Sequence, residues 1–311
     1  MAITSLSSKR SNLLGVLALS RPRNLAIAAV TLLLIRYGWM TRWNTGGASL
    51  QTSVFQIFEA TLVMVLLMAA GNIINAYFDV QEDRINRPQR AIVDRTVKRR
   101  VLIFTHQVLN LLGLLIALHL SWGLGSLGPL VLATMVSWIL WRYSASWKSI
   151  PLLGNASIAL LLGLVPLWLA SLEYPGAPPE LQLDLLQNLG AYGIMAMAIG
   201  MVRELAKDAM DMEGDAVAKK STFPLWKGPE VTRKLCLVLW VCVALIYAMG
   251  VQRWGDIHNW SSWMMWGAPF PGWALCMVLL LQRNTRWKAL SRATLLTLIL
   301  GIVQCFWIPG V

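Results

Sequence analysis

Residues 54–75 are VFQIFEATLVMVLLMAAGNIIN, and Glu59 is the only charged side chain among them. This run is long enough to cross the hydrocarbon core of a bilayer as a helix, which takes about 17–25 residues. The rest of the chain has the same character, since 57% of its 311 residues are hydrophobic and 14% are charged. Soluble domains have about 45–50% apolar and about 25% charged residues. The composition argues against a soluble enzyme or a disordered chain and predicts an all-α polytopic membrane protein.

The sequence contains nine apolar stretches that we expect to be transmembrane helices. The first is weakened by Arg36 near its end, and the eighth is short. We expect them to form a single transmembrane domain over residues 1–311, built from two four-helix half-repeats and one further helix. The nine expected spans are 24–41, 54–75, 101–120, 124–142, 152–171, 186–204, 235–252, 268–282 and 293–309.

Basic residues alternate between the two ends of these spans. Of the 27 Lys and Arg residues, 24 lie before the first span or after an even-numbered one, and the opposite loops hold only Arg36, Arg42 and Arg253. Such an excess marks cytoplasmic loops. We therefore expect a multi-pass protein, in a cell inner membrane, whose amino terminus lies in the cytoplasm. The net charge of +12 then reflects topology and attraction to lipid headgroups, and no nucleic-acid partner is expected.

Two acidic clusters follow the second and the sixth span. In a helix, residues four apart share a face, so each cluster is expected to line one helical face. Asp211 and Asp215 repeat Asp79 and Asp83 at a constant offset of 132 residues, which indicates two copies of a half-bundle with a site between them. The first cluster contains Asn72, Asn75, Asp79 and Asp83, and the second contains Glu204, Asp208, Asp211 and Asp215.

Carboxylate and amide oxygens without His or Cys suit a hard cation such as Mg²⁺. Mg²⁺ usually takes one or two carboxylates and completes its shell with water and substrate phosphates. The two clusters therefore predict Mg²⁺ ions that bridge the protein to a diphosphate, at a site on the cytoplasmic side. Two other interpretations remain open, a solvated helix face and an ion relay of a transporter. The cations expected to bind the remaining diphosphate oxygens are Arg84, Arg87, Arg142, Lys148, Arg203 and Lys207.

The motifs resemble those of the UbiA superfamily of intramembrane prenyltransferases. Asn75-Ala76-Tyr77-Phe78-Asp79-Val80-Gln81-Glu82-Asp83, with Arg84-Ile85-Asn86-Arg87-Pro88 after it, is similar to the first family motif, and Asp211 to Asp215 matches the second. Tyr143-Ser144-Ala145-Ser146-Trp147-Lys148, Gly154-Asn155 and Arg21-Pro22-Arg23-Asn24 are also similar to family elements. Ala76 departs from the family, because many members have Asp there. Position 76 is about 100° away from the face of the other acids, so we expect the metal site to be intact.

The resemblance implies an enzyme that moves a polyprenyl group from its diphosphate to a lipid-soluble acceptor. It implies metal binding by Asn75 and the acids Asp79, Asp83, Asp211 and Asp215, and diphosphate binding by the cations together with Asn72 and Tyr143. Substrate contacts are expected from Asn24, Tyr77, Phe78 and Asn155, although the aromatic rings also suit plain packing. Asp208 either accepts the acceptor's proton or pairs with Lys207 or Arg203.

Within the superfamily the motifs resemble the digeranylgeranylglyceryl phosphate synthase and chlorophyll synthase branches. A geranylgeranylglyceryl phosphate-type acceptor is therefore the first expectation, and an aromatic, quinone or tetrapyrrole acceptor is the alternative. A transporter and a non-catalytic prenyl-diphosphate binder are the alternatives from other classes. The chain length of the prenyl donor and the oligomeric state do not follow from the sequence.

Overall fold

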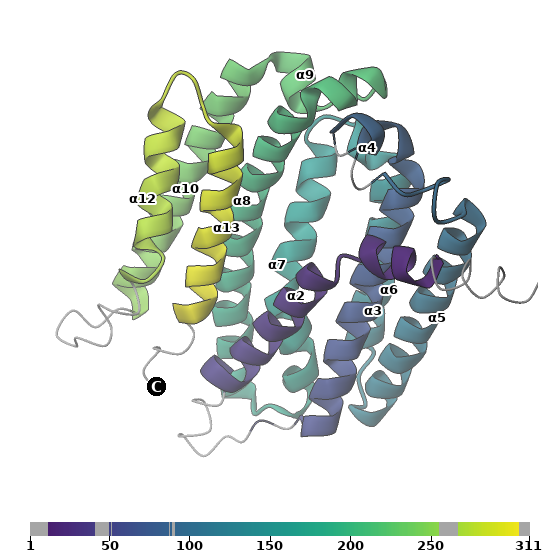
Figure 1. Cartoon of the computed structure of the whole chain (residues 1–311). Helices are drawn as coiled ribbons and strands as arrows, with labels where there is room; N and C mark the ends of the chain where they lie inside the picture. Colours follow the sequence, from purple (N-terminus) through teal and green to yellow (C-terminus); the bar gives the residue numbers. More distant parts are fainter. Residues whose placement is uncertain are drawn as a thin grey trace, which may run out of the picture. The chain divides into compact units, whose positions relative to one another are not determined.

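The computed structural model describes residues 12–40, 50, 52–86, 88, 91–254 and 267–304, and its regular elements are helices. A first helical segment covers 12–19, and a 48° bend separates it from the following helix. The helices after it are α2 (Pro22–Leu34), α3 (Val54–Phe78), α4 (Val80–Asn86), α5 (Arg99–Gly123), α6 (Gly128–Ala145), α7 (Leu153–Glu173), α8 (Pro179–Val217), α9 (Phe223–Lys227), α10 (Pro229–Trp254), α12 (Phe270–Leu281) and α13 (Trp287–Gln304) (Figure 1).

Five described helices are long and apolar enough to cross a membrane, and a sixth span is present if the bent pair at the start of the chain counts as one. These helices confirm an integral membrane protein. α6, α12 and α13 lie where further spans are expected, and the last residues of the ninth expected span are outside the described residues. The five candidate spans are Val54–Phe78, Arg99–Gly123, Leu153–Gly176, Leu181–Val217 and Pro229–Gln252.

The chain divides into two compact units. Unit 1 is Met1–Val30, Thr52–Lys148 and Glu213–Lys220, and unit 2 is Thr31–Gln51, Ser149–Met212 and Ser221–Val311. The carboxyl-terminal end of α8 thus belongs to the unit that holds the first acidic motif.

Unit 1 is built around α3, which packs against α5 and α6 (Figure 1). α3 begins with a capping box, in which Ser53 and Gln56 each accept a hydrogen bond from the other's backbone N–H. Gly71 allows close approach to α6, because a Cβ there would lie 2.7 Å from Leu140. Around the carboxyl-terminal end of α3, buried apolar side chains form a cluster, namely Ile73, Ala76, Val80, Val93, Val97 and Leu102.

Unit 2 contains α7, most of α8, and α9 to α13. Gly163 on α7 faces Gly193 on α8 so closely that a Cβ on Gly163 would lie 2.7 Å from the Gly193 carbonyl oxygen. Small residues at such a crossing let membrane helices pack backbone against backbone. Elsewhere in the unit, Trp240 is fully buried and stacks on Trp273 at 6.4 Å between ring centroids. Its indole N–H donates to the Trp273 carbonyl at 3.2 Å.

Arg36, which weakens the first expected span, is neutralised within unit 2. It lies in a π-helical turn, Ile35–Trp39, that continues α2. Its Nε lies 2.9 Å from Glu173 Oε1, and both side chains are buried. A charge at membrane depth is costly unless it is paired, so this ion pair explains how an arginine is tolerated there.

Two expected helix boundaries differ from the structure. The sixth expected span, 186–204, is part of the 39-residue helix α8, which carries the second acidic motif within the helix and not beyond it. The first motif does not lie on one unbroken helix, because α3 ends at Phe78 and α4 begins at Val80. Hydrophobicity marks only the part of a helix inside the bilayer, whereas polar caps and tertiary contacts decide where the helix ends.

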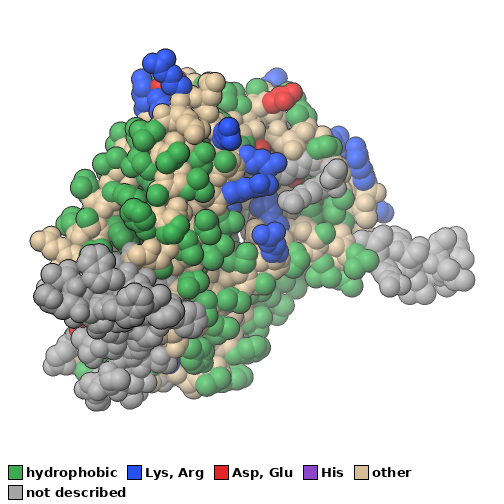
Figure 2. All heavy atoms as spheres, turned by 60° about the vertical axis from the view of Figure 1, so that its left-hand side comes forward, with side chains coloured by type: hydrophobic (Ala, Val, Ile, Leu, Met, Phe, Trp, Pro, Cys, Tyr) green, Lys and Arg blue, Asp and Glu red, His purple; other side chains and the backbone are tan. Residues whose placement is uncertain are grey.

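Large apolar side chains cover much of the surface of unit 2. α10 exposes Val231, Val238, Val241, Leu245 and Met249, and Figure 2 shows hydrophobic side chains spread widely over the face in view, with Lys and Arg in a few groups. Soluble proteins rarely expose apolar patches of this extent. This surface is the kind that lipid chains cover.

Candidate active site

The first acidic motif lies at the junction of α3 and α4. Asp79 caps α3 with φ −85° and ψ 16°, outside regular helical geometry. The helical register nevertheless continues, because the Asp79 N–H donates to Asn75 O and the Asp83 N–H donates to Asp79 O, both at 2.9 Å. The shared face of Asn75, Asp79 and Asp83 that the spacing predicts is therefore kept in the backbone register across the junction.

Asn75 and Asp79 are in direct contact. The side-chain amide of Asn75 donates to Asp79 Oδ2. This bond uses the nitrogen of Asn75 and leaves its Oδ1 buried without a hydrogen-bond donor. A buried oxygen without a donor costs about 1–3 kcal/mol, and a bound cation would remove this cost.

Two lysines neutralise Asp79. Lys148, just after α6, donates to Asp79 Oδ1, and Lys220, just after α8, has its Nζ 3.5 Å from the same oxygen. Lys220 also lies 2.8 Å from Glu82 Oε1 and 3.8 Å from Asp215 Oδ1. The end of α8 and the end of α3 therefore converge, so that an acid of the second motif lies beside acids of the first.

A second contact holds the same two helix ends together. The Gly214 N–H on α8 donates to Asn86 Oδ1 at the end of α4, at 3.2 Å. A Cβ on residue 214 would overlap the Asn86 side-chain amide. The absence of a Cβ at residue 214 thus leaves room for the Asn86 side chain beside α8.

The cluster has unusual electrostatics. Burial raises the pKa of Asp79, but the Lys148 and Lys220 ammonium groups and a hydrogen bond with Glu82 outweigh burial and lower that pKa to about 2. Burial and the neighbouring Asp79 raise the pKa of Glu82 to about 7. Burial lowers the pKa of Lys220, yet the acids around it give a net rise. Asp79 is therefore ionised at neutral pH, whereas the neighbouring Glu82 keeps its proton to a higher pH than an ordinary glutamate.

The remaining acids of the second motif lie in unit 2. Asp208 accepts a hydrogen bond from the Asn155 amide at 2.7 Å, so two residues expected at the site are brought together. The structure shows Arg203 and Lys207 on Glu204, at 3.1 and 2.6 Å. Asp211 is half-buried one helical turn before Asp215 on α8.

Basic side chains lie beside several aromatic rings of unit 1. Lys148 Nζ is 5.9 Å from the centroid of the Phe78 ring, and Phe78 packs edge-to-face on Tyr77. The Arg142 guanidinium lies 5.6 Å from the centroid of the Trp147 ring. Such contacts stabilise cations by about 0.5–2 kcal/mol, so the rings hold the basic side chains around the cluster in place.

Other predicted site residues are placed less centrally. Asn72 donates to the Ser20 carbonyl at 2.9 Å and so fastens α3 to the start of the chain. Asn24 and Arg84 are exposed, and Tyr143 is half-buried. Arg87 lies outside the described residues.

Ala76, where many family members have Asp, points into the buried apolar cluster of unit 1 and is 5% exposed. This confirms the expectation that position 76 lies off the acidic face.

Sequence reasoning missed Glu82, Lys220 and Asn86 as members of the cluster. Glu82 is three residues from Asp79, a helical neighbour spacing that signals a shared face. Lys220 follows the second motif by five residues, but nothing in its local sequence shows that it turns back.

The donor set fits Mg²⁺ in kind. Among the described residues no three His, Cys, Asp or Glu side chains are arranged to hold a metal ion, and Lys148 and Lys220 pair with carboxylates of the cluster. Two oxygens of the cluster, Asn75 Oδ1 and Glu82 Oε2, are nevertheless buried without a hydrogen-bond partner and so are suited to bind a cation. Oxygen ligands of this type are those that Mg²⁺ prefers.

Fold and cluster together define a helical membrane protein in which Asp215 of the second acidic motif shares the Lys220 ammonium group with Asp79 of the first. Residues 24–300 match the model of the UbiA prenyltransferase family. The chain therefore belongs to the UbiA prenyltransferase family, as its motifs indicate.

Two similar proteins carry the name digeranylgeranylglyceryl phosphate synthase. The chain is 31% identical over 261 residues to digeranylgeranylglyceryl phosphate synthase of Methanoregula boonei, with 81% of this chain and 80% of the relative covered. It is 39% identical over 169 residues to the enzyme of the same name from Methanosarcina mazei, with 54% of each chain covered. The matched part spans about half the length of the second relative.

Solved structures show the same fold. A structure described as digeranylgeranylglyceryl phosphate synthase in membranes is 22% identical, with a TM-score of 0.66 and coverage of 96% of this chain and 98% of that one. A UbiA homologue from Archaeoglobus fulgidus bound to GPP and Mg²⁺ is 17% identical, with a TM-score of 0.66 and coverage of 96% and 100%. At these identities the likeness establishes the fold.

Proposed function

We propose that this chain is a Mg²⁺-dependent prenyltransferase that moves a polyprenyl group from its diphosphate to a geranylgeranylglyceryl phosphate-type lipid acceptor. The observation that carries the proposal is the meeting of the two acidic motifs, in which Lys220 lies against Asp79 and Asp215 at once. Membership of the family and the names of these relatives support the reaction and the acceptor class.

In this proposal the metal ligands are Asn75, Asp79, Asp83, Asp211 and Asp215. Mg²⁺, when bound, supplies Lewis-acid neutralisation of the diphosphate leaving group. Asp79 and Asp215 position the donor's head at the end of the helices, and Lys148 stabilises the charge that develops as the allylic C–O bond breaks. Arg84, Arg87, Arg142, Arg203, Lys207, Asn72 and Tyr143 remain the proposed further diphosphate ligands.

Asp208 is well placed to keep a fixed orientation, because it accepts a hydrogen bond from Asn155. We propose that Asp208 accepts the proton that the acceptor substrate loses in the reaction. Tyr77, Phe78 and Asn24 stay proposed substrate contacts, and exclusion of water by the apolar surroundings prevents quenching of the allyl cation.

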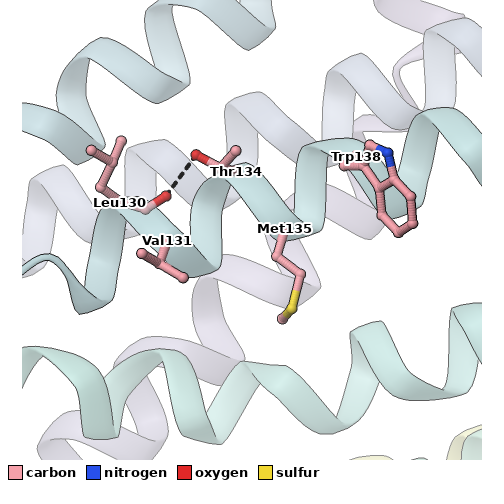
Figure 3. A pocket seen from close by; sticks show the side chains of 5 residues that line it. All are labelled: Leu130, Val131, Thr134, Met135 and Trp138. Atoms are coloured by element: carbon pink, nitrogen blue, oxygen red, sulfur yellow. Dashed lines mark hydrogen bonds between the residues drawn. The ribbon is translucent and has the colours of Figure 1, made fainter.

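One side of α6 offers an apolar wall for the prenyl chain. Leu130, Val131, Thr134, Met135 and Trp138 line a shallow and widely open depression (Figure 3). The Thr134 hydroxyl donates to the Leu130 carbonyl at 2.8 Å, so this polar group is satisfied within the helix. This surface is therefore apolar, and an isoprenoid chain could pack against it.

We further propose nine transmembrane helices in one domain, with the amino terminus and the acidic cluster at the cytoplasmic face of an inner membrane. The distribution of Lys and Arg supports this orientation. α6, α12 and α13, at three of the nine expected positions, support the number of helices.

The test is turnover by purified protein in lipid nanodiscs. Geranylgeranyl diphosphate and geranylgeranylglyceryl phosphate, with Mg²⁺, are expected to give diphosphate and a doubly prenylated lipid, detected by mass spectrometry. Asp79→Asn and Asp211→Asn are expected to reduce the rate by at least about 100-fold, because each removes a carboxylate that would hold the Mg²⁺ needed to neutralise the departing diphosphate. Glu213→Gln, an exposed carboxylate between Asp211 and Asp215 on α8, is the matched control and is expected to keep the wild-type rate.

Each other result contradicts a stated part of the proposal. Full turnover by both Asp variants refutes the catalytic assignment. Product from an aromatic or tetrapyrrole acceptor alone refutes the acceptor class. Binding without product identifies a non-catalytic binder, and ion or lipid flux without bond formation identifies a transporter.

A further inference from the structure

Lys220 occupies the centre of the acidic cluster. Its Nζ lies 2.8 Å from Glu82 Oε1, 3.5 Å from Asp79 Oδ1 and 3.8 Å from Asp215 Oδ1. The side chain is only 12% exposed. A single ammonium group therefore contacts acids that come from both motifs.

The end of α8 is built to place this side chain. Lys220 N–H donates to Asp215 O at 2.9 Å and Lys219 N–H donates to Ala216 O at 3.1 Å, the two bonds of a Schellman helix end. Such an end needs a left-handed residue, and Lys219 supplies it with φ 55°. The hydrogen bond from Lys220 N–H to Asp215 O brings the Lys220 backbone back to the last turn of α8. The helix end therefore places the Lys220 side chain beside the carboxylates.

We propose that Lys220 is a built-in counter-cation, which neutralises Asp79 and Asp215 before the metal ion binds and withdraws from them when Mg²⁺ binds. This inference rests on the proposed function, which assigns the same two acids to Mg²⁺. A metal ion and an ammonium group within 4 Å of the same oxygens repel each other strongly. Glu82, which is not among the proposed metal ligands, makes the shortest of the three contacts and keeps Lys220 beside the cluster after it withdraws.

A consequence is that Mg²⁺ alone binds weakly and that a diphosphate assists it. The phosphate oxygens offer the displaced ammonium group a new partner. Metal and diphosphate therefore bind cooperatively, and a prenyl diphosphate is favoured over free metal at the cluster. The coupling depends on the positive charge of Lys220.

The experiment measures Mn²⁺ affinity by electron paramagnetic resonance, with purified full-length protein and without diphosphate. Lys220→Met is expected to bind Mn²⁺ at least about tenfold more tightly than the wild type, because loss of one repelling unit charge near the ion is worth more than this factor. Adding inorganic diphosphate is expected to raise Mn²⁺ affinity less in this variant than in the wild type. Lys219→Met is the matched control, since it removes the same charge from an exposed neighbour and is expected to change affinity less than about twofold.

Equal Mn²⁺ affinity of the Lys220→Met and Lys219→Met variants overturns the proposal. Asp79→Asn separates this failure from failure of the proposed function. If Asp79→Asn binds Mn²⁺ as the wild type does, the metal site itself is wrong, whereas loss of binding in Asp79→Asn with no effect of Lys220→Met refutes only the role of Lys220.

A measurement on the wild-type chain covers the case in which Lys220→Met does not fold. Amine labelling followed by mass spectrometry is expected to modify Lys220 to a different extent when Mg²⁺ and inorganic diphosphate are present, because its partners change, with Lys219 unchanged as the internal reference. Identical labelling of Lys220 with and without these ligands contradicts the withdrawal.

Discussion

The ion pair of Arg36 and Glu173 offers a sharp test of how unit 2 tolerates charge. Their N···O distance is 2.9 Å, and their side chains are 6% and 1% exposed. At an effective dielectric constant of about 20, the attraction at this distance is roughly 6 kcal/mol. Removal of one partner leaves the other charge buried, and this costs about 3–5 kcal/mol.

We therefore expect Arg36→Met to lower the free energy of unfolding by about 3–5 kcal/mol. The double variant Arg36→Met/Glu173→Met removes both charges and keeps similar volume, so it is expected to lie within about 1 kcal/mol of the wild type. The assay is reversible unfolding by sodium dodecyl sulfate in mixed micelles, followed by far-ultraviolet circular dichroism. The coupling energy follows from the double-mutant cycle.

Arg99 and Asp94 provide the control. Their N···O distance is also 2.9 Å, but the side chains are 47% and 39% exposed. Arg99→Met is expected to cost at most about 1 kcal/mol, because water screens an exposed pair. The reasoning fails if Arg36→Met costs no more than Arg99→Met, or if the double variant is as unstable as the worse single variant.

Three further outcomes are expected from the same unfolding assay. Lys219→Gly should stabilise the chain by about 1 kcal/mol, because glycine adopts a left-handed φ without strain; a loss of stability would contradict this. Gly193→Leu should destabilise it by about 1–3 kcal/mol, since a Cβ there lies 2.5 Å from the Gly163 carbonyl oxygen, and an unchanged stability would mean that the helices separate easily. The folded-state pKa of Glu82, about 7, lies above its ordinary value of 4.5, so its proton contributes stability that is present below pH 4.5 and lost as pH rises towards 7. In metal-free buffer Glu82→Gln should flatten this part of the pH profile, and an unaltered slope would show that another group causes it.

Much of the fold could be predicted from local sequence. Five expected spans are long apolar helices, because the requirement to bury about 20 apolar residues in lipid is a local property. The constant spacing of Asp79 and Asp83 and of Asp211 and Asp215 predicted the paired motifs for the same reason, since helical periodicity alone sets which side chains share a face.

The sequence by itself determined a helical membrane protein of the UbiA family with two related acidic motifs. Only the tertiary structure decided how their charges are balanced. Lys148 lies 69 residues from Asp79, Gly214 meets Asn86 across 128 residues, and Lys220 reaches three acids through the turn that ends α8. Spacing along a helix says nothing about partners on other helices, because the three-dimensional path of the chain alone brings them within the few ångströms over which an ion pair acts.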